Sequence, residues 1–318
     1  MSLKRFPNAE IVPTEILGEE LKFPNGRTAQ NRFLKAAMTE RLSTYSPEDP
    51  KKHGLPTEHI LNIYDKWGHG QFGMTLTAKC IGGSGGLCIF YFLCNCSRTN
   101  LEAIGNAIIF KEGDSSERRF LYTQWAQKMK QDGSLAIVQL SHAGRQTPIY
   151  VNPHPWSASD VQLKTSDNQY GKPIGLTLEQ IRPVFKNTVV YLTGGFRTVG
   201  AMVDAIQRDT TQGIGLGRPV TAEPDLPKKI LNGTVPSAVK DEFNQNEMGK
   251  TIMASCSQIE QMGRKSVEGA GGDVMDQISD FTDGNLVAKY DEAVVEFMRE
   301  MKEAVTAGRT PKSIIVFN

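Results

Sequence analysis

Short apolar runs alternate along the chain with longer segments in which apolar residues recur every three or four positions. A short apolar run is typical of a buried strand, and the wider spacing is typical of a helix with one buried face. Strands that alternate with helices favour a mostly parallel sheet in an α/β fold. The pattern predicts five strands: Phe33–Met38, Gly73–Thr77, Leu135–Leu140, Val189–Leu192 and Gly213–Leu216.

Helices are predicted between and after these strands. One follows a Thr57 cap, a second covers Ser116–Lys130, and a third carries an apolar stripe at helical spacing formed by Val199, Met202, Val203 and Ile206. A last helix, about Asn285–Ala307, is followed by Gly308, and glycine commonly ends helices. The chain therefore predicts strand–helix–strand units followed by a terminal helix.

Composition and charge exclude several classes of partner. The 318 residues contain 36 Lys and Arg against 35 Asp and Glu, a net charge of +1, so no overall positive field attracts nucleic acid or an anionic membrane. The longest apolar run, Leu87–Cys94, is far shorter than the roughly 20 residues that span a bilayer, and the first residues lack a secretion signal. Four of the five cysteines cluster at Cys80, Cys88, Cys94 and Cys96, unlike a disulfide framework. We expect a cytoplasmic protein with reduced thiols and with neither a nucleic-acid nor a membrane partner.

Three stretches of sequence occur together in an informative order. They are NRFLKAAMT at residues 31–39, VQLSHAGR at 138–145, and VYLTGGFR at 190–197 followed by GLGRP at 215–219. In this order they resemble the Old Yellow Enzyme family of NADH:flavin oxidoreductases, which are FMN enzymes built on a TIM barrel. No single stretch is decisive, and the resemblance rests on their order.

The resemblance implies an FMN site and a small-molecule substrate. Backbone at Ala37 and Met38, the Thr39 hydroxyl and the Gln139 amide would meet the flavin ring, and a phosphate site would be formed by Gly194, Gly195, Gly217 and Arg218. The implied activity is hydride transfer from NADH or NADPH through FMN to an electrophilic alkene. Taken singly, each residue also has a structural explanation, such as a tight turn for the glycines. For His142 and Arg145 we expect a packing and hydrogen-bonding role.

The chain is too short between two of its strands for a complete barrel. A TIM barrel has eight strands, each strand–helix–strand unit takes about 30 residues, and only residues 141–188 separate the third and fourth predicted strands. We expect an incomplete α/β barrel of about five strands over residues 1–230, with a deletion near residues 182–188. The missing stretch is where the family keeps its substrate-binding and proton-donating side chains, so no catalytic residue is assigned.

Two further segments depart from the family. Residues 78–99 differ in composition from their neighbours and are interpreted as an insert, for which we hypothesise translated non-coding sequence or alternative splicing. Residues 231–318 form a C-terminal extension that ends in the terminal helix. Within it, residues 232–284 are rich in Gly, Asn, Gln and Ser, and we expect an irregular conformation there.

Four rival interpretations remain open at this stage. Gly82–Gly86 satisfies the Gly-x-Ser-x-Gly pattern of serine hydrolases. Its two extra glycines and the apolar run after it, however, are a poor match to the strand–turn–helix that presents the serine in those enzymes. The cysteine cluster could ligate zinc, but it lacks a Cys-x-x-Cys pair. Gly213–Gly217 does not complete a dinucleotide fingerprint because Arg218 stands where its last glycine is needed. The fourth is a catalytically dead relative of flavin enzymes that acts as a binding protein.

Overall fold

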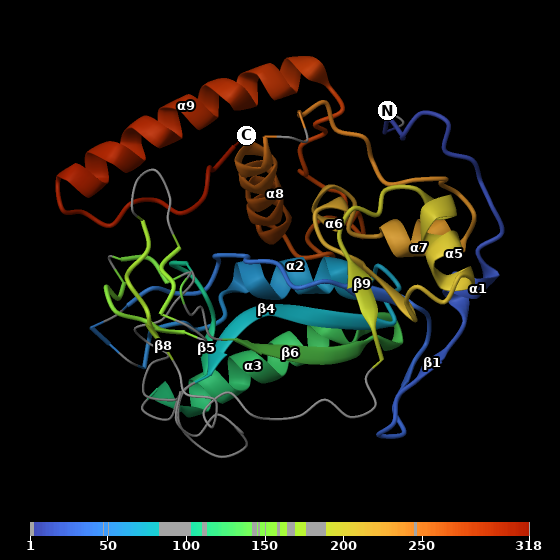
Figure 1. Ribbon diagram of the computed structural model, residues 1–318, viewed down its shortest axis with the longest axis horizontal. Helices are drawn as coiled ribbons and strands as arrows, with labels where there is room; N and C mark the ends of the chain where they lie inside the picture. Colours follow the sequence, from blue (N-terminus) through green and yellow to red (C-terminus); the bar gives the residue numbers. More distant parts are fainter. Residues whose placement is uncertain are drawn as a thin grey trace.

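A parallel sheet with helices packed on one face forms the body of the molecule (Figure 1). The computed structural model describes residues 3–46, 48–49, 51–82, 103–109, 113–141, 145, 147–149, 151–157, 160–163, 169–175, 189–244 and 247–317. Three sequence predictions lie outside these described residues: those for residues 83–99 of the insert, for residues 182–188 and for His142.

Five parallel strands follow the order β9–β10–β3–β4–β6. Their bounds are β3 (Phe33–Lys35), β4 (Met74–Gly82), β6 (Leu135–Ser141), β9 (Tyr191–Thr193) and β10 (Gly213–Leu216). A sixth strand, β5 (Ile108–Ile109), pairs with the last two residues of β4. Within the described part of the chain, β6 and β9 are the outer strands, each paired on one side only. The predicted α/β class with a parallel sheet is confirmed.

Some strand ends differ from the sequence prediction. The strand β10 has the predicted bounds, whereas β3 ends at Lys35 instead of Met38, with one further backbone hydrogen bond from Ala36 to Leu216. The strand β4 continues past Thr77 into the segment assigned to the insert. Pairing explains this extension, since its last residues lie between β6 on one side and β5 on the other. The strand β5 itself was not predicted, because two residues carry no periodic signal.

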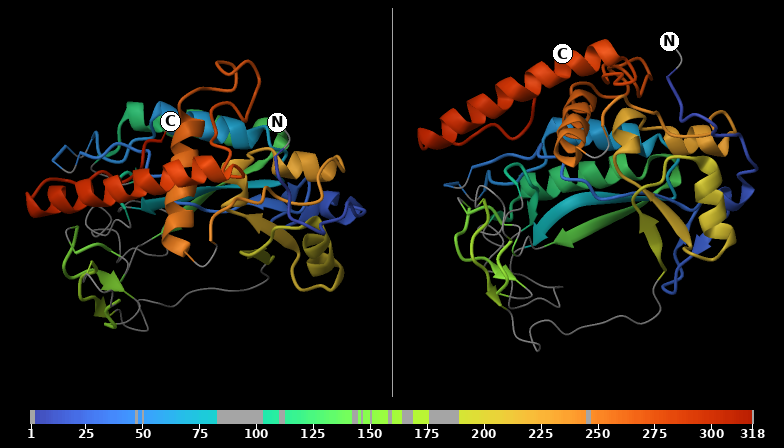
Figure 2. Two further views of the ribbon diagram at one scale, coloured as in Figure 1. Left: turned by 90° about the horizontal axis from the view of Figure 1, so that it is seen from above. Right: turned by 45° about the horizontal axis from the view of Figure 1, so that its top comes forward.

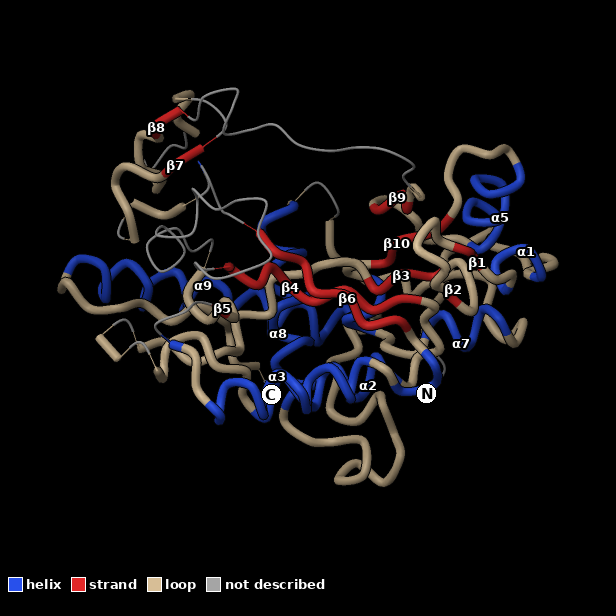
Figure 3. Tube along the Cα trace, turned by 90° about the horizontal axis from the view of Figure 1, so that it is seen from below, coloured by secondary structure: helices blue, strands red, loops and turns tan. Residues whose placement is uncertain are grey.

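Helices α2 (Glu58–Gly68), α3 (Ser116–Met129) and α5 (Val199–Gln207) begin where hydroxyl caps stand in the sequence. The side chains of Thr57, Ser115 and Thr198 each accept a hydrogen bond from the first-turn backbone N–H three residues ahead. The predicted Thr57 cap is confirmed. Figure 3 shows α2 and α3 on the same side of the sheet.

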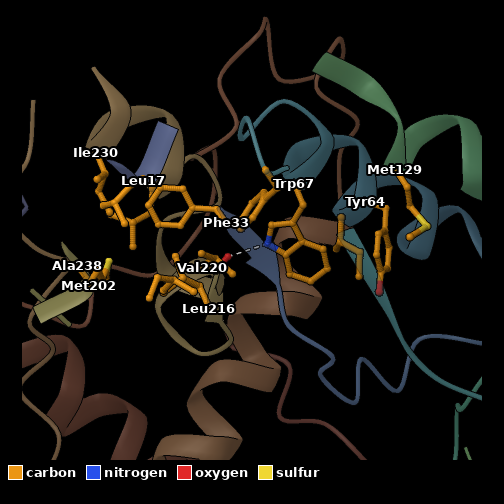
Figure 4. Packing of buried hydrophobic residues seen from close by; sticks show 14 of the residues in the cluster. Leu17, Phe33, Tyr64, Trp67, Met129, Met202, Leu216, Val220, Ile230 and Ala238 are labelled. Carbon is orange, nitrogen blue, oxygen red and sulfur yellow. Dashed lines mark hydrogen bonds between the residues drawn. The ribbon is translucent and has the colours of Figure 1, made fainter. Parts of the chain in front are cut away.

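One continuous core joins the central strands to the helices (Figure 4). Phe33 of β3 and Leu216 of β10 are buried beneath Trp67 of α2 and Met202 of α5. The indole Nε1 of Trp67 donates a hydrogen bond of 2.8 Å to the carbonyl oxygen of Val220, so this large ring is buried with its polar atom satisfied. This packing fixes the central strands, whose carboxyl ends carry the predicted site.

The expectation of an irregular segment over residues 232–284 is wrong for α8 (Met248–Gly263), which is a regular helix. Its weak sequence signal arises from the polar residues Ser257, Gln258 and Gln261, which are buried and hydrogen-bonded to other segments. Ile259 and Met262 of the same helix belong to the core of the sheet and α2. Hydrogen bonds to other segments thus stabilise this helix, although its apolar residues do not follow a clear helical period.

The terminal helix α9 (Gly284–Thr306) agrees with the predicted span, and Gly308 after it has a positive φ of 66°. The helix lies apart from the sheet, across α8 (Figure 2). Tyr290 anchors it in a second aromatic cluster with Phe243, Phe281 and Phe317. The Tyr290 hydroxyl also lies 3.0 Å from Ser257 Oγ of α8.

The remaining elements are short. Outside the central sheet, β1 (Leu21–Lys22) pairs with β2 (Thr28–Ala29) and β7 (Trp156–Ser157) pairs with β8 (Ile174–Gly175). The other helices are α1 (Glu15–Gly18), a 3-10 turn at Gln131–Gly133, α6 (Pro219–Ala222) and α7 (Leu226–Leu231). Of the helices in the described residues, none has the length and apolar character needed to span a bilayer.

Candidate functional site

The predicted cofactor residues stand at or just after the carboxyl ends of four parallel strands. Ala37–Thr39 follow β3, Gly194 and Gly195 follow β9, Gly217 and Arg218 follow β10, and Gln139 lies near the end of β6. Parallel strands bring their carboxyl ends to one edge of the sheet, which is where α/β proteins bind ligands. The topology therefore places all eight residues at one edge.

The segments after β3 and β10 lie in direct contact. The backbone N–H of Ala36 donates a hydrogen bond of 2.9 Å to the carbonyl of Leu216, which extends the pairing of the two strands by one residue. One residue further, a Cβ placed on Gly217 would stand 4.0 Å from Cγ of Met38. The structure thus brings the predicted flavin-ring segment and the predicted phosphate segment together.

Gln139 presents an unused acceptor. Its side-chain Oε1 is buried and has no hydrogen-bond partner among the described residues, while its backbone N–H donates to Thr77 Oγ1 at 3.0 Å. A buried amide oxygen without a partner costs about 1–3 kcal/mol, so such an atom in a strand calls for a ligand donor. The strand β4 lies between Gln139 and the β3–β10 pair.

The glycine pair after β9 adopts a backbone that only glycine takes readily. Gly194 and Gly195 have φ values of 122° and 75°, and no atom lies within 4 Å of the position where either would carry a Cβ. Both residues are exposed, so their backbone faces open space. The helix α5 begins shortly afterwards, behind its Thr198 cap.

Two arginines and one aspartate meet beside these loops. Arg197 and Arg218 line a cavity of about 50 Å³ together with Asp241 and Thr251, and Gln139, Gly194 and Gly195 lie outside its lining. Arg218 Nη1 donates a hydrogen bond of 2.6 Å to Thr251 Oγ1 of α8, and Arg197 Nη1 donates one of 2.9 Å to the carbonyl of Phe196. In the part of the chain that the structure describes, neither guanidinium forms an ion pair with a carboxylate.

Burial and mutual repulsion set the charge states in this cavity. Burial, with a smaller contribution from Arg218, lowers the pKa of Arg197, which nevertheless stays cationic at neutral pH. Burial raises the pKa of Asp241, and the two arginines oppose that rise. Two half-buried guanidiniums next to one carboxylate leave excess positive charge, which suits a phosphate or another anion.

Sequence reasoning missed Arg197 and Asp241. Arg197 stands two residues after the glycine pair, and this position was the available signal. Asp241 carries no local signal, because it reaches the arginines only through tertiary folding. Arg145 is exposed, and its predicted packing role is not tested.

The rival sites gain no support. Gly213 and Gly215 lie inside β10, where a Cβ would clash with Tyr191 and Thr193 of β9, so they serve strand packing rather than a phosphate loop. No group of three metal-ligating side chains occurs among the described residues. Most of Gly82–Gly86 lies outside them.

Comparisons with known proteins find both sequence relatives and similar folds. No family model matches the chain. It is 25% identical to the NADH-dependent flavin oxidoreductase nadA of Aspergillus parasiticus, covering 86% of this chain and 92% of the relative. It is 28% identical to the NADH-dependent flavin oxidoreductase iliE of Hypocrea jecorina over 50% of this chain and 38% of that protein.

Among solved structures, the old yellow enzyme homologue from Zymomonas mobilis superposes with a TM-score of 0.50 at 15% identity, covering 74% of this chain and 98% of that one. Histamine dehydrogenase from Rhizobium sp. 4-9 gives the same TM-score at 13% identity, with 77% and 48% covered. These likenesses confirm the barrel-derived fold. In sequence, the chain is similar to curated proteins named NADH-dependent flavin oxidoreductases, one of which it covers over nearly its whole length.

Proposed function

We propose that this chain binds FMN at the carboxyl edge of its sheet and uses it to transfer hydride from NADH or NADPH to an electrophilic alkene. The observation that carries the proposal is that one edge of the sheet holds two kinds of unused polar group. These are the Gln139 Oε1, which has no hydrogen-bond partner, and two guanidiniums that lack ion pairs among the described residues. A flavin mononucleotide offers the matching groups, a ring N–H at one end and a phosphate at the other. The relatives named as flavin oxidoreductases support this choice.

The residues divide into ring-binding and phosphate-binding sets. Gln139 would accept a hydrogen bond from the pyrimidine edge of the ring, and the Ala37–Thr39 segment would lie along the ring. The exposed backbone of Gly194 and Gly195, with Arg218 and Arg197, would hold the phosphate. The chemistry that bound FMN supplies is two-electron transfer between the nicotinamide and the alkene.

Flavin binding is the direct test. Apoprotein titrated with FMN should quench flavin fluorescence at a one-to-one ratio, and anaerobic NADH should then bleach the visible flavin absorbance. A protein that stays colourless after soaking with excess FMN would show that the proposal is wrong.

A second candidate is a flavin-binding protein without turnover. It is favoured because the sequence assigns to no residue the role of donating a proton to the alkene. The two candidates differ in one assay: the non-catalytic protein would bind FMN but reduce none of a panel of activated alkenes with NAD(P)H. Turnover of any of them would exclude it.

The domain organisation is also a proposal: a truncated barrel over residues 1–230, an insert at 78–99, a deletion near 182–188 and an extension over 231–318. It is supported by the single-sided pairing of β6 and β9 among the described residues. The alignment with nadA runs over 423 positions, more than the 318 residues of this chain, and so contains long gaps. Transcript sequencing across both junctions tests the splicing hypothesis, which fails if every message encodes the printed sequence.

A further inference from the structure

Lys35, the last residue of β3, carries a charged side chain into the interior between the sheet and α2. The side chain is fully buried. Its Nζ donates hydrogen bonds to Tyr64 OH at 2.9 Å, to the Leu76 carbonyl at 3.1 Å and to Glu40 Oε1 at 3.2 Å. It also lies 4.6 Å from the ring centre of Tyr64 and 4.2 Å from that of Trp67.

Glu40 closes this network from the other side. Its side chain is only 2% exposed, and its Oε1 accepts a second hydrogen bond, of 2.6 Å, from Tyr64 OH. Lys35 ends the strand, and Glu40 follows it by five residues. The ion pair therefore joins the two ends of the segment Ala36–Thr39, which contains all three residues predicted to meet the flavin ring after β3.

The energetics of a buried pair favour a geometric role over a stabilising one. Removing two charges from water is costly, and a buried pair is often no more stabilising than apolar side chains of the same volume. A methionine at residue 35 would fill the same space between Tyr64 and Trp67. A methionine has no charge to hold Glu40 in place, so it could not fix the path of the four residues between positions 35 and 40.

We propose that Lys35, Glu40 and Tyr64 form a clip that fixes the conformation of Ala36–Thr39, so that this segment is shaped for the flavin before the flavin binds. The three are positioning residues: Lys35 lies on the helix side of the sheet, as its contacts with Tyr64 and Trp67 show. The role of the clip in flavin binding rests on the proposed function. Its effect on the conformation of Ala36–Thr39 does not depend on any ligand. Preorganisation of this kind lowers the conformational cost of binding.

The experiment compares Lys35→Met, Glu40→Gln and the double variant with Thr75→Val as matched control. Thr75 is buried in the neighbouring strand β4 as the register partner of Lys35, and its hydroxyl lies 2.8 Å from Ser134 Oγ, so the control removes a buried polar group beside Lys35 that is hydrogen-bonded to Ser134. Each protein is measured for melting temperature, for amide hydrogen exchange at residues 36–39 without ligand, and for the Kd of FMN.

The clip predicts different behaviour for stability and for binding. Lys35→Met should lower the melting temperature, speed exchange at residues 36–39, and raise the Kd of FMN about tenfold or more, since small misplacements of a binding segment are costly. The double variant removes both charges, so its melting temperature should recover while exchange and Kd stay high. Thr75→Val should lower the melting temperature and leave exchange at residues 36–39 unchanged.

Two outcomes would overturn the clip. One is equal exchange at residues 36–39 in Lys35→Met and the unchanged protein; the other is a double variant whose FMN affinity recovers together with its melting temperature. If the unchanged protein binds no FMN, the proposed function fails, and hydrogen exchange alone decides whether the clip exists. If Lys35→Met does not fold, Tyr64→Phe, which removes only the hydroxyl, should still speed exchange at the same residues.

Discussion

The middle and the two edges of the central sheet contain the same kinds of apolar residue but bury them to different degrees. Ile214 of β10 is fully buried, whereas Leu192, its register partner on β9, is 41% exposed. At the opposite edge, Val138 of β6 is 46% exposed. Paired residues of parallel strands point to the same face, so Leu192 faces the helix side as Ile214 does.

The difference lies in what covers each strand. Helices α2, α5 and α8 supply side chains to the core over β3 and β10, and each is joined to the sheet in the described core cluster. Fully burying a valine or leucine side chain is worth about 1.5–3 kcal/mol, and the half-exposed side chains of the edge strands gain only part of this. The stability of this molecule therefore comes from the middle of its sheet, and the site residues there stand on firmer support than those at the edges.

A pair of truncations tests this contrast most strongly. Phe33→Ala should lower the free energy of unfolding by about 3–5 kcal/mol, because it opens a cavity in the core, whereas Leu192→Ala should cost less than about 1 kcal/mol. Urea unfolding followed by tryptophan fluorescence measures both. Similar losses for the two variants would show that the edge is covered in solution.

Arg218, on the phosphate side of the site, follows β10 in the well-supported middle of the sheet. Arg218→Met should raise the Kd of FMN by about 10- to 100-fold, since hydrogen bonds to charged groups are worth roughly 1.5–3 kcal/mol. Riboflavin, which lacks the phosphate, is the matched control and should bind both proteins equally. A loss of riboflavin binding in the variant would mean that Arg218 supports the fold or the ring instead.

The ring side extends to the edge strand β6. Gln139→Leu should raise the Kd of FMN and of riboflavin by the same factor, about two- to tenfold, because a neutral hydrogen bond is worth roughly 0.5–1.5 kcal/mol. Fluorescence titration with both ligands gives the two constants. An effect confined to FMN would place Gln139 near the phosphate and contradict the assigned orientation.

Sequence reasoning was reliable where local signals decide the structure. The bounds of β10, the cap at Thr57 and the Gly308 stop after α9 follow from residue type and spacing alone. It failed where distant segments decide it: α8 needs its buried Gln258 and Gln261 to find partners on other segments, and β4 is lengthened by pairing with β5.

The candidate site shows the same division. Resemblance located the eight predicted residues along the chain, and the parallel topology places them at one edge. The cavity beside Arg218 was not predictable, because Arg197, Asp241 and Thr251 come from three separate segments. The clip at Lys35 was not predicted either, since the sequence shows only a lysine among apolar neighbours in a strand.

Asp241 is expected to have the smallest effect and to act through pH. Its negative charge opposes the two arginines that would bind the phosphate, so Asp241→Asn should lower the Kd of FMN about two- to fivefold at neutral pH, the scale of a partly screened charge. Burial raises the pKa of Asp241 above its unfolded value, so the protonated form is favoured in the folded protein. The stability that this group contributes is present at low pH and is lost as pH rises through the folded pKa.

The ratio of the Kd of FMN for the unchanged protein to that for Asp241→Asn reports the titration of Asp241. Ionisation of the FMN phosphate cancels in this ratio, because it affects both proteins alike. The ratio should approach one at low pH, where Asp241 is neutral, and reach its plateau above the raised pKa of the carboxyl group. Titrations of the unchanged protein and of Asp241→Asn between about pH 4 and pH 8 measure it. A ratio that is constant across this range would mean that Asp241 and the phosphate do not share the arginines, and that the anion lies on the glycine pair alone.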